Sequence, residues 1–167
     1  IEVCRELRKN PDTRTIPIIM MTAKGEEADV VSGLEVGADD YVPKPFSTKV
    51  LIARLRALLR RTAEKKDEEV GELIRRGTFV LDLGRREASI AGKPLDLTFT
   101  EFEILRLLAK RPGWVYSRSR IVNEIKGSDY PVTERAVDVQ IVGLRKKLGD
   151  ADLIETVRGV GYKFKNN

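Results

Sequence analysis

Few residues of this chain belong to the types that carry catalysis. The 167 residues include no histidine and a single cysteine, Cys4. Acid–base catalysis by histidine and a Ser-His-Asp triad are therefore excluded, and almost nothing remains for a zinc site. One cysteine cannot form a disulfide within the chain, which indicates a reducing cytoplasm. No apolar run approaches the roughly 20 residues of a membrane span. The expectation is a cytoplasmic protein that is not an enzyme and has no membrane partner.

The polar residues that could act together lie at two places. Lys44 follows a short apolar strand, and Thr22 ends an earlier apolar run. A lysine aimed off the end of a buried strand could meet an anionic partner, but a lone Lys-Pro after a strand is usually only a turn, and a strand-end threonine is usually a cap. The second place is a helix expected over 133–150, whose outer face carries Arg135 and Lys146.

The net charge of +5 is unevenly distributed along the chain. Acidic and basic residues balance over 1–71, so the whole excess lies in 72–167. A basic bias confined to one part indicates a polyanionic partner there. On this number alone, ordinary surface charge explains the bias equally well.

Helices and buried strands alternate over 1–61. A helix opens the chain, the apolar run at 16–23 is typical of a parallel strand covered on both faces, and 26–37 is an amphipathic helix. A second short strand follows, and a strong helix begins at the N-cap Ser47. This αβαβα order predicts a parallel α/β sheet. The charge-dense segment 62–71 is typical of a linker, or of a solvated helix end that runs into one. The apolar face of the last helix consists of Val50, Leu51, Leu55, Leu58 and Leu59.

The second part begins with short strands and continues with three helices. The strands are expected over 77–97, and a terminal hairpin is expected over 154–165. The first helix is predicted to open at Thr100, with Glu103 three residues later completing a capping box. The second helix is predicted to open at the N-cap Ser117. Strands, three helices with a short turn between the last two, and a closing hairpin describe an α+β winged helix.

The third of these helices has two distinct faces. Its apolar stripe, Val137, Ile141, Leu144 and Leu148, must face the core. The opposite face fits a DNA major groove, with side chains reading base edges while cations hold phosphates. A lone basic amphipathic helix is more often a solvated surface helix, but its place before a Gly-rich hairpin in the basic part favours DNA binding. The predicted DNA-binding residues are Arg135, Val139, Gln140, Val142, Gly143, Arg145, Lys146, Thr156, Arg158 and Tyr162.

Long motifs in both parts resemble one family. The effector domain of OmpR/PhoB-type response regulators is similar to "TEFEILRLLAKRPGWVYSRSRIVNEI", "RAVDVQIVGLRKKL" and "IETVRGVGYKF". The second half of their receiver domain is similar to "IPIIMMTAKGEEADVVSGLEVGADDYVPKPF". The resemblance implies a sequence-specific, DNA-binding transcriptional regulator of a phosphorelay two-component system. Its parts would be the C-terminal half of a flavodoxin-like receiver (1–61), a linker (62–71) and a winged-helix effector domain (72–167).

The resemblance also implies that Thr22, Tyr41 and Lys44 sense phosphorylation. In such receivers the lysine pairs with the phosphorylated aspartate, the threonine hydrogen-bonds the phosphoryl group, and the tyrosine then turns inward. An ammonium and a hydroxyl at the carboxyl ends of parallel strands can converge on one phosphoryl group. The family's phosphoacceptor and its acidic Mg²⁺ pair belong to strands upstream of 1–15. The expectation is therefore an N-terminally truncated receiver that holds no cofactor and cannot be phosphorylated in the family's way.

Partners are implied by the resemblance as well. The family dimerises through the face that 26–61 forms here, and the expected pairs are Asp40 with Arg54 of the partner subunit and Asp39 with Arg61 of the partner subunit. Half a parallel sheet leaves a strand edge open, which favours a swapped or intertwined homodimer. The rest of the expected dimer face is apolar: Val30, Val31, Leu34, Val50 and Ala53.

Two further partners and one alternative complete these expectations. The loop 126–132 corresponds to the family's RNA polymerase contact, and a cognate histidine kinase is the partner of a complete receiver. The alternative function is a receiver-derived dimerisation module that binds DNA weakly or not at all.

Overall fold

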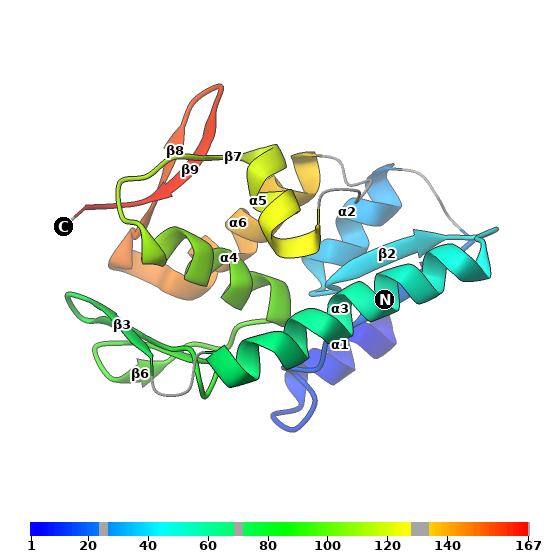
Figure 1. Cartoon of the computed structure of the whole chain (residues 1–167), viewed down its shortest axis with the longest axis horizontal. Coiled ribbons are helices and arrows are strands. Elements are labelled where there is room, and N and C mark those ends of the chain that lie inside the picture. Colours follow the sequence, from blue (N-terminus) through cyan, green and yellow to red (C-terminus); the bar gives the residue numbers. More distant parts are fainter. Residues whose placement is uncertain (24–26, 69–71, 128–133, 167) are drawn as a thin grey trace.

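The computed structural model describes the chain apart from residues 24–26, 69–71, 128–133 and 167, and it describes no side chains at 27–30, 60–68 and 134. Figure 1 shows two parts that lie side by side. We call residues 1–68 the N-terminal part and residues 72–166 the C-terminal part.

The N-terminal part alternates helices and strands, which confirms the predicted α/β class. Strands β1 and β2 pair in parallel, with Met20 opposite Tyr41. The last helix runs on to Glu68, so most of the segment expected as a linker continues this helix. The elements are α1 (Glu2–Lys9), β1 (Ile19–Thr22), α2 (Glu27–Glu35), β2 (Asp40–Pro43) and α3 (Thr48–Glu68).

The C-terminal part is a winged helix, as predicted. Four antiparallel strands come first: β3 (Leu73–Arg76), β4 (Phe79–Asp82), β5 (Glu87–Ile90) and β6 (Lys93–Pro94). The helices are α4 (Phe99–Lys110), α5 (Arg118–Lys126) and α6 (Glu134–Leu148), followed by a short 3₁₀ turn (Gly149–Ala151). A second sheet, in the order β7-β9-β8, contains β7 (Tyr116–Ser117), β8 (Ile154–Val157) and β9 (Gly161–Phe164).

The predicted start of α4 is wrong by two residues. The capping box is formed by Thr98 and Glu101, so the helix begins at Phe99 and not after Thr100. Thr100 is already inside the first turn, where its N–H and hydroxyl both donate to Asp39 of the N-terminal part. Glu103, the acid expected in the box, is instead buried. The start of α5 is as predicted, because Ser117 accepts a hydrogen bond from the N–H of Arg120.

One continuous core fills the C-terminal part. Leu105 and Leu108 of α4 and Ile141 and Leu144 of α6 have no exposed surface. These side chains pack with those of β4 and β9, where the rings of Phe79 and Phe164 lie 5.5 Å apart. Such a core holds α6 in one orientation.

The hairpin of β8 and β9 is fixed to the core by a close backbone approach. A Cβ atom at Gly161 would lie 1.9 Å from the carbonyl oxygen of Tyr116. Only glycine fits at this position, because any side chain would collide with the backbone of β7.

The apolar side chains of the N-terminal part are covered less completely. Of the predicted apolar face of α3, Leu58 is buried, but Leu55 and Leu59 are about half exposed. Among the described residues, the sheet of this part has only two strands, β1 and β2. Val3 of α1 and Met21 of β1 are also exposed.

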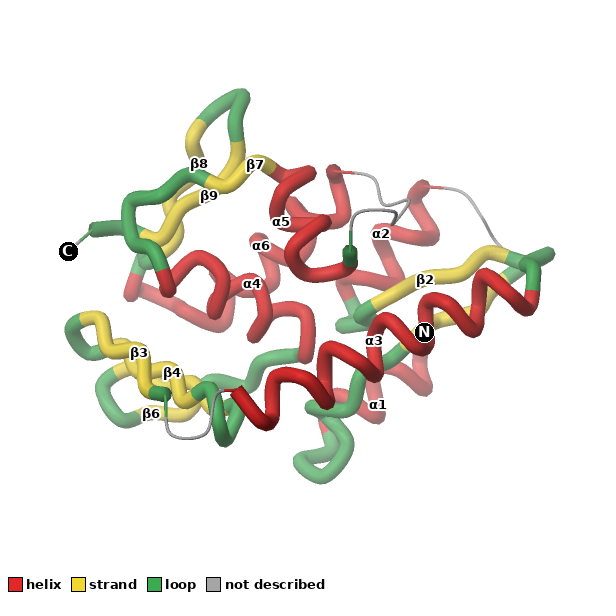
Figure 2. The backbone as a smooth tube through the Cα atoms, viewed as in Figure 1, coloured by secondary structure: helices red, strands yellow, loops and turns green. Residues whose placement is uncertain are grey.

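The two parts meet where α2 packs against α6. Figure 2 shows α2, α4, α5 and α6 in the middle of the molecule, with β2, α1 and α3 on one side and the sheets of the C-terminal part on the other. The helix predicted to read DNA therefore lies next to the N-terminal part.

Candidate nucleic-acid interface

Helix α6 has one side that faces the core, an opposite side, and two flanks between them. Val137, Ile141, Leu144 and Leu148 are buried, as the helical spacing predicted. The opposite side is open: Val142 is 52% exposed, and Arg135 and Lys146 are also exposed. This open strip carries two cations and one apolar side chain, the composition that suits phosphates and thymine methyl groups.

One flank of α6 faces the β8–β9 hairpin through polar contacts. The side chain of Arg145 donates to the carbonyl oxygen of Ile154 at 2.9 Å and to the hydroxyl of Thr156 at 2.8 Å. Asp138, two helical turns earlier, accepts a hydrogen bond of 2.6 Å from the hydroxyl of Tyr162. Contacts within the chain thus hold three of the residues predicted to contact DNA: Arg145, Thr156 and Tyr162.

Asp138 also binds Arg118, the first residue of α5. The Nε atom of Arg118 lies 2.6 Å from Oδ1 of Asp138, and this contact raises the pKa of the Arg118 guanidinium. Burial, together with the hydrogen bond to Asp138, raises the pKa of Tyr162. The phenol therefore stays protonated and acts as a donor at neutral pH. The sequence analysis assigned no role to Asp138.

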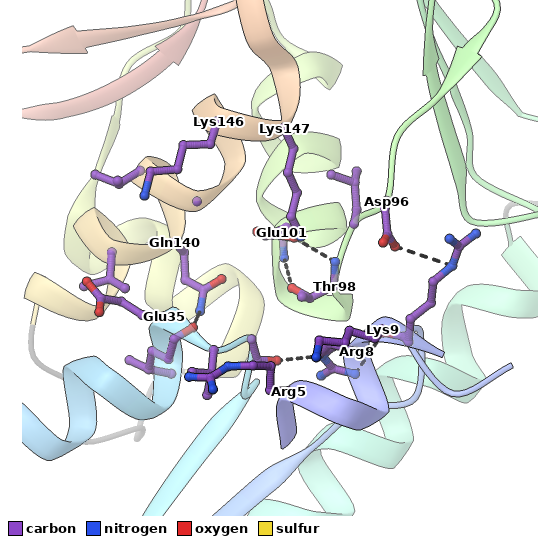
Figure 3. Close-up of a pocket in the computed structure, with 18 residues that line it drawn as sticks. Arg5, Arg8, Lys9, Glu35, Asp96, Thr98, Glu101, Gln140, Lys146 and Lys147 are labelled. Atoms are coloured by element: carbon purple, nitrogen blue, oxygen red, sulfur yellow. Dashed lines mark hydrogen bonds and ion pairs between the residues drawn. The ribbon is translucent and has the colours of Figure 1, made fainter. Parts of the chain in front are cut away.

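The other flank of α6 faces the N-terminal part. Gln140 is buried and its Nε2 atom donates to the carbonyl oxygen of Leu34 at 3.4 Å. Val139 and Gly143 line a cleft of about 490 Å³ between α6 and the end of α2 (Figure 3). Three predicted DNA-binding residues therefore lie on the side of α6 that faces the N-terminal part. Gln140 is buried there, and Val139 and Gly143 are half-buried in a cleft that Val142 and Lys146 also line.

Cations outnumber carboxylates around this cleft. Lys147 pairs with Glu101 at 2.6 Å, and Arg14 pairs with Asp96 at 3.4 Å. Figure 3 shows Lys146 of α6 on the same cleft. The remaining basic residues of its lining are Arg5, Arg8 and Lys9 from α1.

Asp39 joins the two parts with one carboxylate. Its Oδ2 accepts from Nη2 of Arg8 and from the N–H of Ile18, each at 2.8 Å. Its Oδ1 accepts from the N–H of Thr100 at 2.9 Å and from the hydroxyl of Thr100 at 2.8 Å. The Asp39 side chain has no exposed surface. Lys126 of α5 donates to the backbone carbonyl of the same residue.

The residues of the expected dimer face lie in different environments. Asp40 pairs with Arg54 of its own chain at 3.1 Å, and the Asp40 carboxylate is nearly buried. Leu34 is buried against α6, whereas Val50 and Ala53 are exposed. Val31 is half-buried, and the side chains of Val30 and Arg61 lie outside the described residues.

The three residues expected to sense phosphorylation come from the two parallel strands. Thr22 and Lys44 lie at the same end of the sheet, where the Lys44 N–H donates to the Thr22 carbonyl oxygen at 2.6 Å. The Lys44–Pro45 peptide is cis. Tyr41 is buried, and a Cβ atom at Gly33 of α2 would lie 3.2 Å from its ring.

The remaining expectations concern the RNA polymerase contact, a metal site and a membrane span. Most of the loop expected to contact RNA polymerase, 126–132, lies outside the described residues. No three acidic, histidine or cysteine side chains lie close enough to hold a metal ion among the residues that the structure describes. The donor set for Mg²⁺ is therefore not found there. Within the same residues, no helix is both long and apolar enough to cross a membrane.

Two family profiles match the chain. "Response regulator receiver domain" matches residues 1–56, and "Transcriptional regulatory protein, C terminal" matches residues 92–164. The phosphate regulon transcriptional regulatory protein PhoB of Rhizobium meliloti is 46% identical over 169 residues, which cover 99% of this chain and 73% of that protein.

Solved structures are similar as well. The response regulator DrrB of Thermotoga maritima, an OmpR/PhoB homologue, is 32% identical with a TM-score of 0.52, over 99% of this chain and 73% of that one. The DNA-binding domain of Klebsiella pneumoniae RstA, solved in complex with the RstA box, is 32% identical with a TM-score of 0.51. That match covers 56% of this chain and 97% of the RstA domain.

Proposed function

The chain belongs to the OmpR/PhoB-type response regulators, DNA-binding transcriptional regulators of two-component systems, and we propose that it binds duplex DNA with α6 and the β8–β9 hairpin together. Helix α6 enters the major groove with its open strip toward the base edges. The exposed Arg158, at the tip of the hairpin, binds the adjacent backbone.

The single observation that carries this proposal is the open strip of α6. The core stripe fixes the helix, and Arg135, Val142 and Lys146 point away from it. The hairpin lies on one flank of the same strip, through the contacts of Arg145. The strip and the hairpin can therefore meet one duplex from the same side.

DNA binding in this form requires the N-terminal part to move. A major groove is roughly 12 Å wide and encloses a helix on three sides. The flank of α6 that carries Val139, Gln140 and Gly143 is turned toward α2. Because α2 packs against α6 on this flank, we propose that the two parts separate before α6 enters the groove.

A salt titration tests the proposed DNA surface. The probe is a duplex of about 30 base pairs selected by this chain from a random pool, long enough for two half-sites. The affinity should fall as salt rises, and Arg158→Ala should weaken binding and reduce the slope of log K against log salt by about 1. Arg85→Ala removes the same charge from the β4–β5 turn and should leave both unchanged. An affinity that does not depend on salt, or equal effects of the two variants, would contradict the proposal.

We also propose a homodimer that uses the α2–β2–α3 face. The exposed Val50 and Ala53 supply an apolar patch on that face. Asp39 and Asp40 are already bound within the chain, so an ion pair with the partner subunit would replace an internal contact. Sedimentation at increasing concentration tests this: Val50→Lys should weaken association, and a chain that stays monomeric throughout would contradict the dimer.

The remaining partners rest on family membership. We propose a cytoplasmic regulator without enzymatic activity, which meets a histidine kinase through its receiver domain and RNA polymerase through 126–132. Mg²⁺ would be held only by an intact receiver.

A further inference from the structure

Asp138 accepts two hydrogen bonds at one carboxylate oxygen. Nε of Arg118 and the hydroxyl of Tyr162 both lie 2.6 Å from its Oδ1. Nη2 of Arg118 also donates to the Tyr162 hydroxyl at 3.3 Å, and the guanidinium carbon lies 5.0 Å from the Tyr162 ring centroid. The three side chains form a closed triangle, in which the negative charge of Asp138 is neutralised by Arg118.

Each corner of this triangle belongs to a different element. Arg118 is the first residue of α5, Asp138 lies in the first half of α6, and Tyr162 lies in β9. Strand β9 is the middle strand of its sheet, where Tyr162 stands between Thr156 of β8 and Tyr116 of β7. A single carboxylate therefore ties the helix pair α5–α6 to the hairpin.

Arg145 supplies a second tie between the same helix and the same hairpin. It lies seven residues after Asp138 on α6, about two turns or 10 Å along the axis. Its two hydrogen bonds reach Ile154 and Thr156 of β8. One tie would allow the hairpin to pivot, but two ties at different heights fix both its distance from α6 and its angle.

A fixed angle is what binding of one duplex by two elements requires. The spacing between a major groove and the neighbouring phosphates is set by the DNA, so the protein must match it before binding or lose affinity in ordering itself. An acidic residue beside a DNA-binding strip is otherwise unfavourable, because it repels phosphates. Asp138 has 41% of its side chain exposed, so solvation alone could accommodate its charge without these partners.

We propose that Asp138, with Arg118, is a positioning residue for DNA recognition: it holds α6 and the β8–β9 hairpin at the separation and angle that one duplex demands. This inference rests on the proposed function, since it presumes that α6 and the hairpin bind the same DNA. It assigns no direct DNA contact to Asp138.

An electrostatic role and a positioning role of Asp138 predict changes of opposite sign in the DNA affinity of Asp138→Ala. Asp138→Ala removes a negative charge from the DNA-binding face, so a purely electrostatic role predicts tighter binding. Loss of positioning predicts weaker binding to the selected duplex, by about tenfold, as expected when a charge-assisted hydrogen bond is lost. Asp150→Ala is the matched control, because it removes the same charge from an exposed site in the 3₁₀ turn after α6.

The slope of the salt dependence separates positioning from phosphate contact. Asp138→Ala should leave the slope on the selected duplex unchanged, because no phosphate contact is lost. Its affinity for a scrambled duplex should be unchanged or slightly higher, so that discrimination between the two duplexes falls.

Tyr162→Phe is a milder second variant, because it keeps the aromatic ring at 162 and the negative charge of Asp138. If the two residues act through each other, it should weaken binding to the selected duplex, and the double variant should be no weaker than Asp138→Ala alone. Full additivity would mean that Tyr162 acts on DNA independently of Asp138. Circular dichroism of each variant checks that the winged helix is retained.

The outcomes separate the inference from the proposed function. If the unmodified chain selects no duplex, the proposed function fails. If the unmodified chain binds but Asp138→Ala binds as tightly as Asp150→Ala, only the positioning role is overturned. An equal loss on selected and scrambled duplexes, or additive effects with Tyr162→Phe, would also overturn it.

Discussion

The two parts of this chain differ in how their side chains are covered. The C-terminal part buries Leu105, Leu108 and Ile141 completely inside one core. The N-terminal part leaves Leu55 and Leu59 of α3 about half exposed and buries few apolar side chains. The C-terminal part is therefore expected to be the more stable of the two, because buried apolar area dominates folding free energy.

The contact between the parts has a different character from either core. Leu34 is buried there against α6, and the other links are polar: Asp39 to Thr100, Lys126 to Asp39, Gln140 to the Leu34 carbonyl oxygen, and Arg14 to Asp96. Polar groups that separate can exchange their partners for water, whereas a separated apolar core exposes surface at a cost of about 25 cal/mol per Å². We therefore expect the two parts, whose hydrogen bonds to each other are few among the described residues, to separate without unfolding the winged helix.

The largest expected effect comes from the core of the C-terminal part. Leu105→Ala should lower the free energy of unfolding of this part by about 4 kcal/mol, because it leaves a cavity among residues that cannot collapse. Leu73→Ala, at a residue of the same part that is 45% exposed, should change it by less than about 0.5 kcal/mol. Urea unfolding followed by the fluorescence of Trp114, the only tryptophan of the chain, measures the C-terminal part. Similar losses for the two variants would contradict the difference in burial.

The next largest effect should come from the buried carboxylate between the parts. Asp39→Asn removes the charge from the acceptor of the two Thr100 hydrogen bonds and should destabilise the joined arrangement by about 1–2 kcal/mol, because hydrogen bonds to a charged acceptor are the stronger ones. Small-angle scattering should then show a larger radius of gyration.

An exposed pair across the same boundary is the matched control. Asp96 meets Arg14 at 3.4 Å and is 58% exposed, so Asp96→Asn should change little, as is typical of surface ion pairs. If Asp96→Asn opened the molecule as much as Asp39→Asn, burial of the carboxylate would not be the cause.

A small effect is expected at the cleft between the parts. Gly143→Ala should stabilise α6 by up to about 1 kcal/mol, because alanine is the better helix former. The added Cβ would lie 3.2 Å from Oε1 of Glu101, whereas the Thr98 N–H and Lys147 hold the other oxygen, Oε2, so a shift of Oε1 by a few tenths of an ångström is enough. Thermal unfolding compares it with Gly149→Ala, which should destabilise by about 1–2 kcal/mol, since Gly149 is left-handed at φ +58°. A loss at Gly143 as large as at Gly149 would mean that Glu101 cannot move.

The sequence predicted the elements well and the contacts between them poorly. The core stripe of α6 and the N-cap Ser117 depend on residues within a few turns, and both were confirmed. The start of α4 was wrong because two overlapping patterns fit a capping box, from Thr98 to Glu101 and from Thr100 to Glu103. Thr100 binds Asp39 instead, a residue remote in sequence that no local pattern indicates.

The candidate site shows the same limit. Helical periodicity found the open strip of α6, but it could not show that Gln140 is covered by α2. It also gave no role to Asp138, because Arg118 and Tyr162 come from other elements. Opposite charges on separate elements carry no periodic signal, so only the fold brings them together.

The exchange of one amide tests the central claim most directly. The Thr100 N–H lies in the first turn of α4, where a helix offers no acceptor of its own, and it donates to Asp39 of the N-terminal part. Hydrogen exchange at Thr100 therefore reports whether the parts are joined, and it is measured in the free chain and in its complex with the selected duplex. We expect Thr100 to be protected in the free chain and to exchange rapidly in the complex, while the amide of Arg120, capped by Ser117, stays unchanged. Protection of Thr100 that persists in the complex would contradict the claim that α6 binds DNA only after the N-terminal part has moved away.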